Sequence, residues 1–208
     1  SKYPNMVERI TTVLIPEGIV NIEDTIYMTG FQGLVREGGR PPSLRPKNNF
    51  DDGVNEKFVI EVLQDTQAPG GAAASNFHFD VIIDVEILNE GSNNTKTSLC
   101  RYSCGQGGKV RLRGSHSTSG FRGLVVDSYS SYFDITGLDL NGCPGQTGPL
   151  LELGEGCHNI NVGVSTLQQL NSFTLASGNR KTYTIGGVSG NLPALAMYEC
   201  KEITFQNL

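Results

Sequence analysis

Short apolar–polar–apolar units recur about every 25 residues along this chain, and this repeat is the strongest constraint on its fold. The central residues of these units lie 20 to 27 residues apart and are Glu61, Glu86, Arg111, Asp134, Asn161, Thr184 and Thr204. A second series runs out of phase with the first, at 124–126, 151–153, 173–175 and 195–197. Self-similarity at a fixed period is typical of repeat architectures, so we expect at least two strands in each repeat.

The repeating units are predicted to be strands. In 77–87 every odd position is apolar and four of the five even positions are polar, which indicates a strand with one buried face. The other apolar runs are short and end at Gly, Asn, Pro or Ser, and no window shows helical spacing. The chain is therefore predicted to be all-β, a single parallel β-helix (solenoid) domain over 1–208 with seven or more coils.

Two other architectures explain the pattern less well. Leucine-rich repeats have a similar length but require a Leu/Asn consensus that this sequence lacks. An antiparallel sandwich has closely spaced strands, but it gives no reason for like positions to return at a fixed long interval.

Charge and hydropathy exclude two kinds of partner. The net charge is −5 and the basic residues are scattered, so a nucleic-acid partner is not expected. No apolar run approaches the ~20 residues of a membrane-spanning helix, so no membrane span is expected either.

The cysteines and one sequon give further expectations. The five cysteines, an odd number, are expected to be buried free thiols, although up to two disulfides could form: Cys100, Cys104, Cys143, Cys157 and Cys200. Cys157 and Cys200 are predicted to lie two coils apart, too far for a disulfide. Cys100 and Cys104 lack the further ligands that structural zinc requires, and no metal site is predicted. Asn93 begins an Asn-Asn-Thr glycosylation sequon.

Two segments carry a resemblance to a known superfamily. Residues 12–26 read TVLIPEGIVNIEDTI, a strand that ends in Pro-x-Gly and leads into another strand, and Gly38-Gly39 follow. Residues 123–126 and 133–138 read GLVV and FDITGL. Both segments resemble the single-stranded right-handed parallel β-helix of the pectate-lyase-like superfamily, which includes polysaccharide lyases, glycoside hydrolases, epimerases and phage tailspikes. The resemblance implies a right-handed coil, a polysaccharide or glycan partner, and an extracellular, cell-surface or virion location.

The ends of the chain lead to an expectation about assembly. Few residues precede the Pro-x-Gly strand, and 201–208 reads as one more coil. Open coils expose strand edges that invite pairing. We expect a fragment of a longer protein or assembly, and a homo-oligomer such as a trimer or an end-to-end filament.

Polar residues at equivalent positions are expected to form outward columns. One column contains the central residues of the first series, and a second contains Asp84, Lys109, Tyr132, Asn159, Thr182 and Glu202. Amides, carboxylates and an aromatic ring on a flat sheet suit sugars, so a carbohydrate-binding face is predicted at Tyr132, Asn159, Asn161 and Asp134. The alternative is an ordinary surface ladder of oppositely charged cross-strand pairs.

The sequence offers few candidates for catalysis. Glu86 and Asp134 are the candidates for a pair of glycosidase carboxylates, and Arg111 is the candidate base of a lyase. Asp84 and Glu86 offer oxygen ligands for Ca²⁺, the one cofactor that the sequence suggests, but Arg111 would lie among them. The superfamily's Gly-His-Gly and Arg-x-Lys motifs are not present as written. A structural, fibre or carbohydrate-binding module is therefore predicted, with a polysaccharide lyase or glycoside hydrolase as the alternative.

Overall fold

The protein is described by a computed structural model that covers residues 11–28, 30, 32–37, 42–62, 80–103, 105–172, 181–183 and 194–206. In this part of the chain the regular secondary structure consists of strands, with no helix. The strand pairs are parallel, except that β15 (Lys181–Tyr183) runs antiparallel to β16 (Leu195–Met197). The prediction of an all-β fold with parallel strands is confirmed.

The strands form two sheets. Sheet 1 contains β1 (Thr11–Ile15), β2 (Ile19–Ile22), β4 (Gln32–Arg36), β5 (Ser43–Pro46), β7 (Ile82–Asn89), β9 (Lys109–His116), β11 (Ser131–Asn141), β13 (His158–Val162), β14 (Ser165–Gln168) and β17 (Lys201–Phe205). Sheet 2 contains β3 (Ile26–Met28), β6 (Lys57–Val62), β8 (Thr97–Tyr102), β10 (Leu124–Val126), β12 (Leu151–Leu153), β15 and β16.

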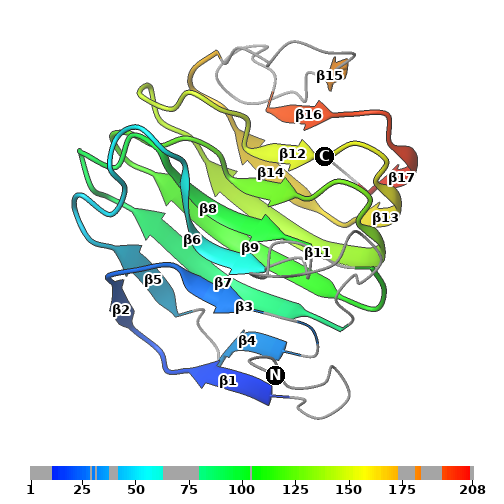
Figure 1. Ribbon diagram of the computed structural model, residues 1–208, viewed down its shortest axis with the longest axis horizontal. Helices are drawn as coiled ribbons and strands as arrows, with labels where there is room; N and C mark the ends of the chain where they lie inside the picture. The colour runs from blue at the N-terminus through cyan, green and yellow to red at the C-terminus, as the bar shows by residue number, and fades with distance from the viewer. Residues whose placement is uncertain are drawn as a thin grey trace, which may run out of the picture.

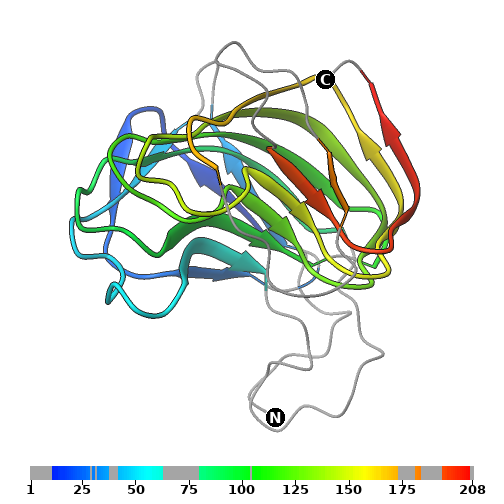
Figure 2. The ribbon, with the colours of Figure 1, turned by 90° about the horizontal axis from the view of Figure 1, so that it is seen from above.

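The chain passes alternately through the two sheets. From β6 onward, for example, β7, β9 and β11 in sheet 1 alternate with β8, β10 and β12 in sheet 2. We call one pass through sheet 1 and the following pass through sheet 2 a circuit. Figure 1 shows the circuits stacked from the blue N-terminal strands to the red C-terminal strands, and Figure 2 shows the two sheets as separate layers.

The core lies between the two layers and consists of inward side chains stacked in register. In sheet 2 one stack is at most 2% exposed and contains Ile60, Cys100, Leu124, Leu151 and Leu195. In sheet 1 the corresponding stack contains Ile83, Val110, Ile135 and Val162. Burial of each large aliphatic side chain contributes roughly 1.5–3 kcal/mol, so these stacks explain the apolar repeat in the sequence.

Most of the predicted strands are found where the repeat places them. The segments 124–126, 151–153 and 195–197 coincide with β10, β12 and β16. Five centres of the first series lie on sheet 1: Glu86, Arg111, Asp134, Asn161 and Thr204. The segment 173–175 and Thr184 lie outside the described residues.

The assignment of Glu61 to the first series is wrong. Its strand, β6, belongs to sheet 2, where Glu61 pairs with Arg101 of β8. This circuit is longer than the repeat, because 40 residues separate Glu61 from Arg101. The interval of 25 residues to Glu86 therefore joins two different sheets, and an apolar–polar–apolar pattern cannot tell them apart.

The predicted outward columns of sheet 1 are also partly wrong. Arg111 pairs with Asp84 and Gly137, whereas Glu86 pairs with Arg113. Asp134 pairs with Lys109, two residues from the predicted Arg111, and a bulge between Ile135 and Gly137 then shifts the register of β11 on β9 by one more residue. Beyond β11 the prediction holds in part, since Asp134, Asn161 and Thr204 lie in one column. However, Thr204 follows Asn161 directly, with no coil between them, and Thr182 of the second column lies on β15 in sheet 2.

Cys157 and Cys200 are closer together than predicted. His158 of β13 pairs with Lys201 of β17, so the two cysteines that precede these residues lie on adjacent strands. The described cysteines are free thiols, namely Cys100, Cys143, Cys157 and Cys200. Cys104 lies outside the described residues.

Candidate functional site

Where the chain passes from β10, β12 and β16 of sheet 2 into sheet 1, the turn and the start of the next strand share a left-handed backbone conformation. Two positions three residues apart have positive φ in successive circuits: Tyr129 (63°) and Tyr132 (52°), Gly156 (71°) and Asn159 (53°), then Glu199 (48°) and Glu202 (54°). A left-handed non-glycine residue costs about 1–2 kcal/mol and is found where its surroundings enforce it.

The hydrogen bonds between circuits enforce this conformation. The amide of Tyr129 donates to the carbonyl of Glu155 at 2.8 Å, and the amide of Gly156 donates to Tyr198 at 3.3 Å. The space at position 156 also excludes a side chain, because a Cβ on Gly156 would lie 2.6 Å from the ring of Tyr129. The turn is therefore a fixed feature that holds the side chain of Tyr132 outward, 54% exposed.

A hollow of about 550 Å³ lies beside this turn on the outer face of sheet 1. We call it the Tyr132 hollow. It is lined by Gly107, Gly108, Lys109, Tyr132, Phe133, Asp134, Asn159, Asn161, Glu202 and Thr204. The structure thus brings together all four residues for which carbohydrate binding was predicted.

The side chains in the Tyr132 hollow present a mixed set of donors and acceptors. Asn161 Nδ2 donates to Asp134 Oδ1 at 3.0 Å, on the exposed surface. The ring of Tyr132 packs edge-on against His158, with 5.4 Å between ring centroids and 82° between ring planes. One ring is therefore held beside amide and carboxylate groups, an arrangement that suits a ligand with hydroxyls and an apolar face.

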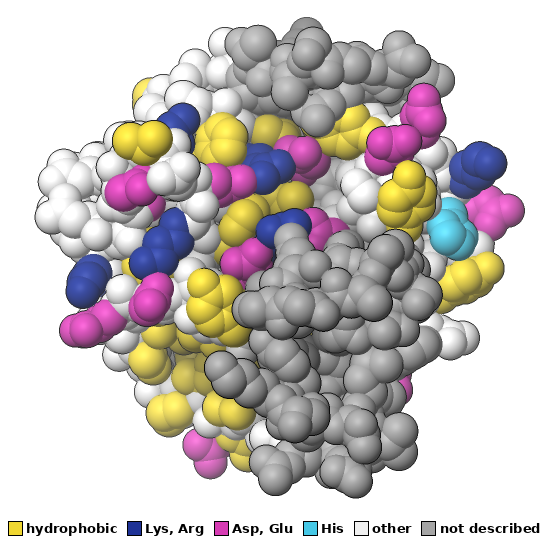
Figure 3. Space-filling model, viewed as in Figure 1, with side chains coloured by type: hydrophobic (Ala, Val, Ile, Leu, Met, Phe, Trp, Pro, Cys, Tyr) yellow, Lys and Arg dark blue, Asp and Glu magenta, His cyan; other side chains and the backbone are white. Residues whose placement is uncertain are grey.

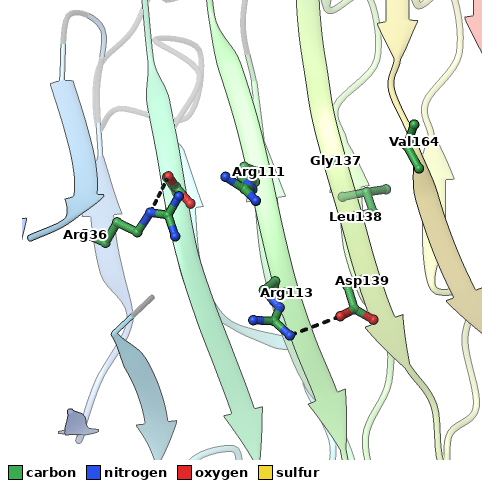
Figure 4. A pocket seen from close by; sticks show the side chains of 8 residues that line it. Arg36, Arg111, Arg113, Gly137, Leu138, Asp139 and Val164 are labelled. Atoms are coloured by element: carbon green, nitrogen blue, oxygen red, sulfur yellow. Dashed lines mark hydrogen bonds and ion pairs between the residues drawn. The ribbon is translucent and has the colours of Figure 1, made fainter. Parts of the chain in front are cut away.

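A second, smaller hollow of about 220 Å³ lies on the same sheet and includes Arg111. Figure 4 shows Arg111 beside Arg36, with Arg113 farther along the same strand, β9. Arg36 is paired with Asp84 at 3.1 Å, and Arg113 with Asp139 at 3.3 Å. Among the described residues no carboxylate forms an ion pair with Arg111, so this Arg111 hollow has three guanidiniums for two carboxylates.

Glu86 and Asp134, the two candidate catalytic carboxylates, do not face one another. Glu86 is paired with Arg113 and Asp134 with Lys109, so they lie on opposite sides of β9 and four residues apart along it. At ~3.3 Å per residue this is ~13 Å along the strand alone, beyond the ~9.5 Å limit for a glycosidase pair. The hydroxyl of Ser43 also donates a hydrogen bond to Glu86.

Sheet 2 has a charged cluster that sequence reasoning missed. Arg101 lies 2.8 Å from both Glu61 and Asp127. Arg122 is paired with Glu56 and, at 2.7 Å, with Glu152. Figure 3 shows basic, acidic and apolar side chains gathered on this face. The register of sheet 2 was the signal that could have revealed the cluster, because Glu61, Arg101 and Glu152 occupy one column.

The charged groups of this cluster neutralise one another, which favours a structural role over a catalytic one. Burial would lower the pKa of Arg122, but Glu56 and Glu152 outweigh this effect and raise it. Burial raises the pKa of Asp127, and the charge of Arg101 opposes the shift. Each arginine thus has two carboxylate partners, which leaves it little capacity for a ligand.

His116 and the predicted sequon residue Asn93 lie away from the two hollows. His116 is buried and uses both ring nitrogens in hydrogen bonds, which indicates a structural role. Asn93, the sequon residue, is exposed, and its Nδ2 donates to Asn49 at 2.7 Å. Within the described segments no three His, Cys, Asp or Glu side chains converge to hold a metal ion.

No helix in the described residues is long and apolar enough to cross a lipid bilayer. No protein-family model, curated protein or solved structure matches this chain.

Proposed function

We propose that this chain is a carbohydrate-binding module of an extracellular or virion-surface protein, and that glycans bind on the outer face of sheet 1. The observation that carries the proposal is Tyr132, an exposed aromatic ring fixed by a left-handed backbone beside Asp134, Asn159 and Asn161. Sugars present many hydroxyls and one apolar face, so such a surface suits them.

We further propose that the two sheets form a right-handed parallel β-helix of the pectate-lyase-like kind. The alternation of the chain between two parallel sheets supports this proposal. Connections between parallel strands of one sheet are right-handed in about 98% of cases. Such a rod also suits a role in a fibre, as a homo-oligomer.

The Arg111 hollow favours glycans with acidic groups. Its third guanidinium has no carboxylate partner among the described residues, and guanidinium groups bind carboxylates and sulfates in a bidentate way. β9 and β11 contribute to both hollows, so one chain of sugars could contact Tyr132 and Arg111 together.

The test is a glycan array with the labelled protein, followed by calorimetry with the strongest glycan. Tyr132→Ala is expected to weaken binding about tenfold, which corresponds to ~1.4 kcal/mol. Tyr129→Ala is the matched control, because Tyr129 is also left-handed and exposed but lies outside the hollow. Equal affinity of the two variants would contradict the proposed site.

Two further measurements test whether acidic glycans are preferred and whether a bound glycan is cleaved. Arg111→Gln should remove any preference for carboxylated or sulfated glycans over neutral ones. Chromatography of each bound glycan after long incubation should show no shortened product. The appearance of new reducing or unsaturated ends would replace the binding proposal with a lyase or hydrolase.

A further inference from the structure

The thiols of Cys157 and Cys200 lie side by side on adjacent strands. The pairs His158–Lys201, Ile160–Ile203 and Val162–Phe205 all have the same sequence offset of 43 residues, which also places Cys157 opposite Cys200. The amide of Lys201 donates to the carbonyl of Cys157 at 2.9 Å, so the register extends to the two cysteines. Neighbouring strands are ~4.8 Å apart, within the Cα separation of about 4.4–6.8 Å that disulfides require.

The two side chains contact one another, and their thiols differ in pKa and in burial. The hydrogen bond between the thiols raises the pKa of Cys157, and burial raises it further. The same hydrogen bond lowers the pKa of Cys200. Cys157 is fully buried, whereas Cys200 is only partly buried. A reagent from solvent therefore reaches Cys200 first, and Cys200 is the better nucleophile because thiolates are the reactive form.

The residue opposite Cys157 just before β11, the preceding strand, leaves Cys200 as its cysteine partner in this column. By the register of β11 on β13, Cys157 is opposite Ser130 on its other side. Ser130 has no thiol, so this column contains a single cysteine pair among the described residues.

We propose that Cys157 and Cys200 form a disulfide that joins the circuits of β13 and β17, with a small-molecule disulfide as the oxidant. The Cys200 thiolate attacks one sulfur of that disulfide and expels a thiolate, which leaves a mixed disulfide on Cys200. The Cys157 thiol then loses its proton to water and attacks Sγ of Cys200, and the second small thiolate leaves. Two protein thiols are oxidised, and one small disulfide is reduced to two thiols.

The disulfide would anchor β17 to the stack. β17 has one described neighbour, β13, and its own side chains are exposed or half-buried. A covalent bond at the start of this pair limits how far β17 can open. Amide hydrogen exchange in 201–206 is therefore expected to slow on oxidation, whereas exchange in β7 and β9 should not change.

To test this, the folded protein is treated with oxidised glutathione and its remaining free thiols are alkylated. The mass of the protein is then measured. We expect the wild type to lose two alkylatable thiols, with no glutathione retained. Cys157→Ser should retain one glutathione on Cys200, and Cys200→Ser should retain none. Cys143→Ser is the control and should form the disulfide as the wild type does.

Digestion of the oxidised protein then identifies the bond. A peptide containing Cys157 linked to one containing Cys200 is the expected product, and the wild type alone suffices for this measurement. Retention of all five thiols, or a different linkage, would overturn the proposal.

Discussion

Nδ2 of Asn89 donates a hydrogen bond to Nδ1 of His116 at 3.1 Å across the adjacent strands β7 and β9. The amide of Asn89 is oriented by two further contacts, since Nδ2 also donates to the carbonyl of Ser119 and Oδ1 accepts from Asn94. Nδ1 of His116 must therefore be the acceptor. Its Nε2 carries the proton and donates to the carbonyl of Arg122 at 3.1 Å. His116 is thus held neutral inside the protein.

The protein should become less stable as the pH is lowered, because His116 is buried in its neutral form. Burial lowers the pKa of His116 from 6.5 to about 4, whereas the unfolded chain has the ordinary value. Between these two pH values the unfolded state binds more protons than the folded state. The contribution of His116 to the free energy of unfolding is therefore complete above pH ~6.5 and is lost as pH falls toward ~4. The expected loss is up to about 3 kcal/mol.

Urea denaturation across this pH range measures the effect. His116→Gln cannot titrate, so its free energy of unfolding should depend less steeply on pH than that of the wild type. The slope is the quantity compared, which allows for a variant that is less stable at every pH. Identical slopes would exclude His116 as the titrating group.

Removal of Arg122 should destabilise the protein strongly. Arg122→Met leaves Glu56 and Glu152 without their cation, and their side chains are only 20% and 12% exposed. Removal of one partner from a largely buried ion pair costs about 3 kcal/mol. Arg113→Met is the matched control, because its pair with Asp139 is nearly half exposed and contributes about 0–1 kcal/mol. The free energies of unfolding of both variants, from chemical denaturation, should differ accordingly.

The left-handed position 159, at the start of β13, should tolerate glycine better than a branched residue. Asn159 has φ of 53°, so Asn159→Gly should be nearly neutral, whereas Asn159→Val should cost about 1–2 kcal/mol. Asn161→Val is the control, since position 161 lies on the same strand, β13, but is not left-handed. Thermal unfolding of the three variants checks the order, and an Asn159→Val protein as stable as Asn161→Val would contradict it.

The parts of the fold that depend on apolar periodicity could be predicted from sequence. The stack of Ile60, Leu124, Leu151 and Leu195 follows from the need to bury aliphatic side chains in every circuit, and β10, β12 and β16 were found residue for residue. Periodicity does not, however, say which sheet a strand joins. Glu61 was misplaced for this reason, and β8 was missed because its residues are nearly all buried, so that it shows no alternation.

The candidate site was predictable where the register is regular. Tyr132, Asp134, Asn159 and Asn161 came together because the offset of 27 residues between β11 and β13 has no irregularity. The bulge after Ile135 could not be foreseen, because an extra residue in a strand leaves the apolar pattern on either side intact. Arg111 was matched with the wrong carboxylates for another reason. The similar apolar units of β7, β9 and β11 lie two residues out of register, so that Glu86 pairs with Arg113 and Asp134 with Lys109.

The arginine pairs of sheet 2 also determine how this protein would respond to force. Arg122 holds Glu56, which precedes β6, and Glu152 of β12, and these side chains lie three strands apart. Contacts in a stacked repeat otherwise join only nearest neighbours, so such a stack can peel one layer at a time. Here the two carboxylates and one guanidinium act as a brace across the intervening layers. Tension along the stack would therefore have to break these layers as one mechanical unit.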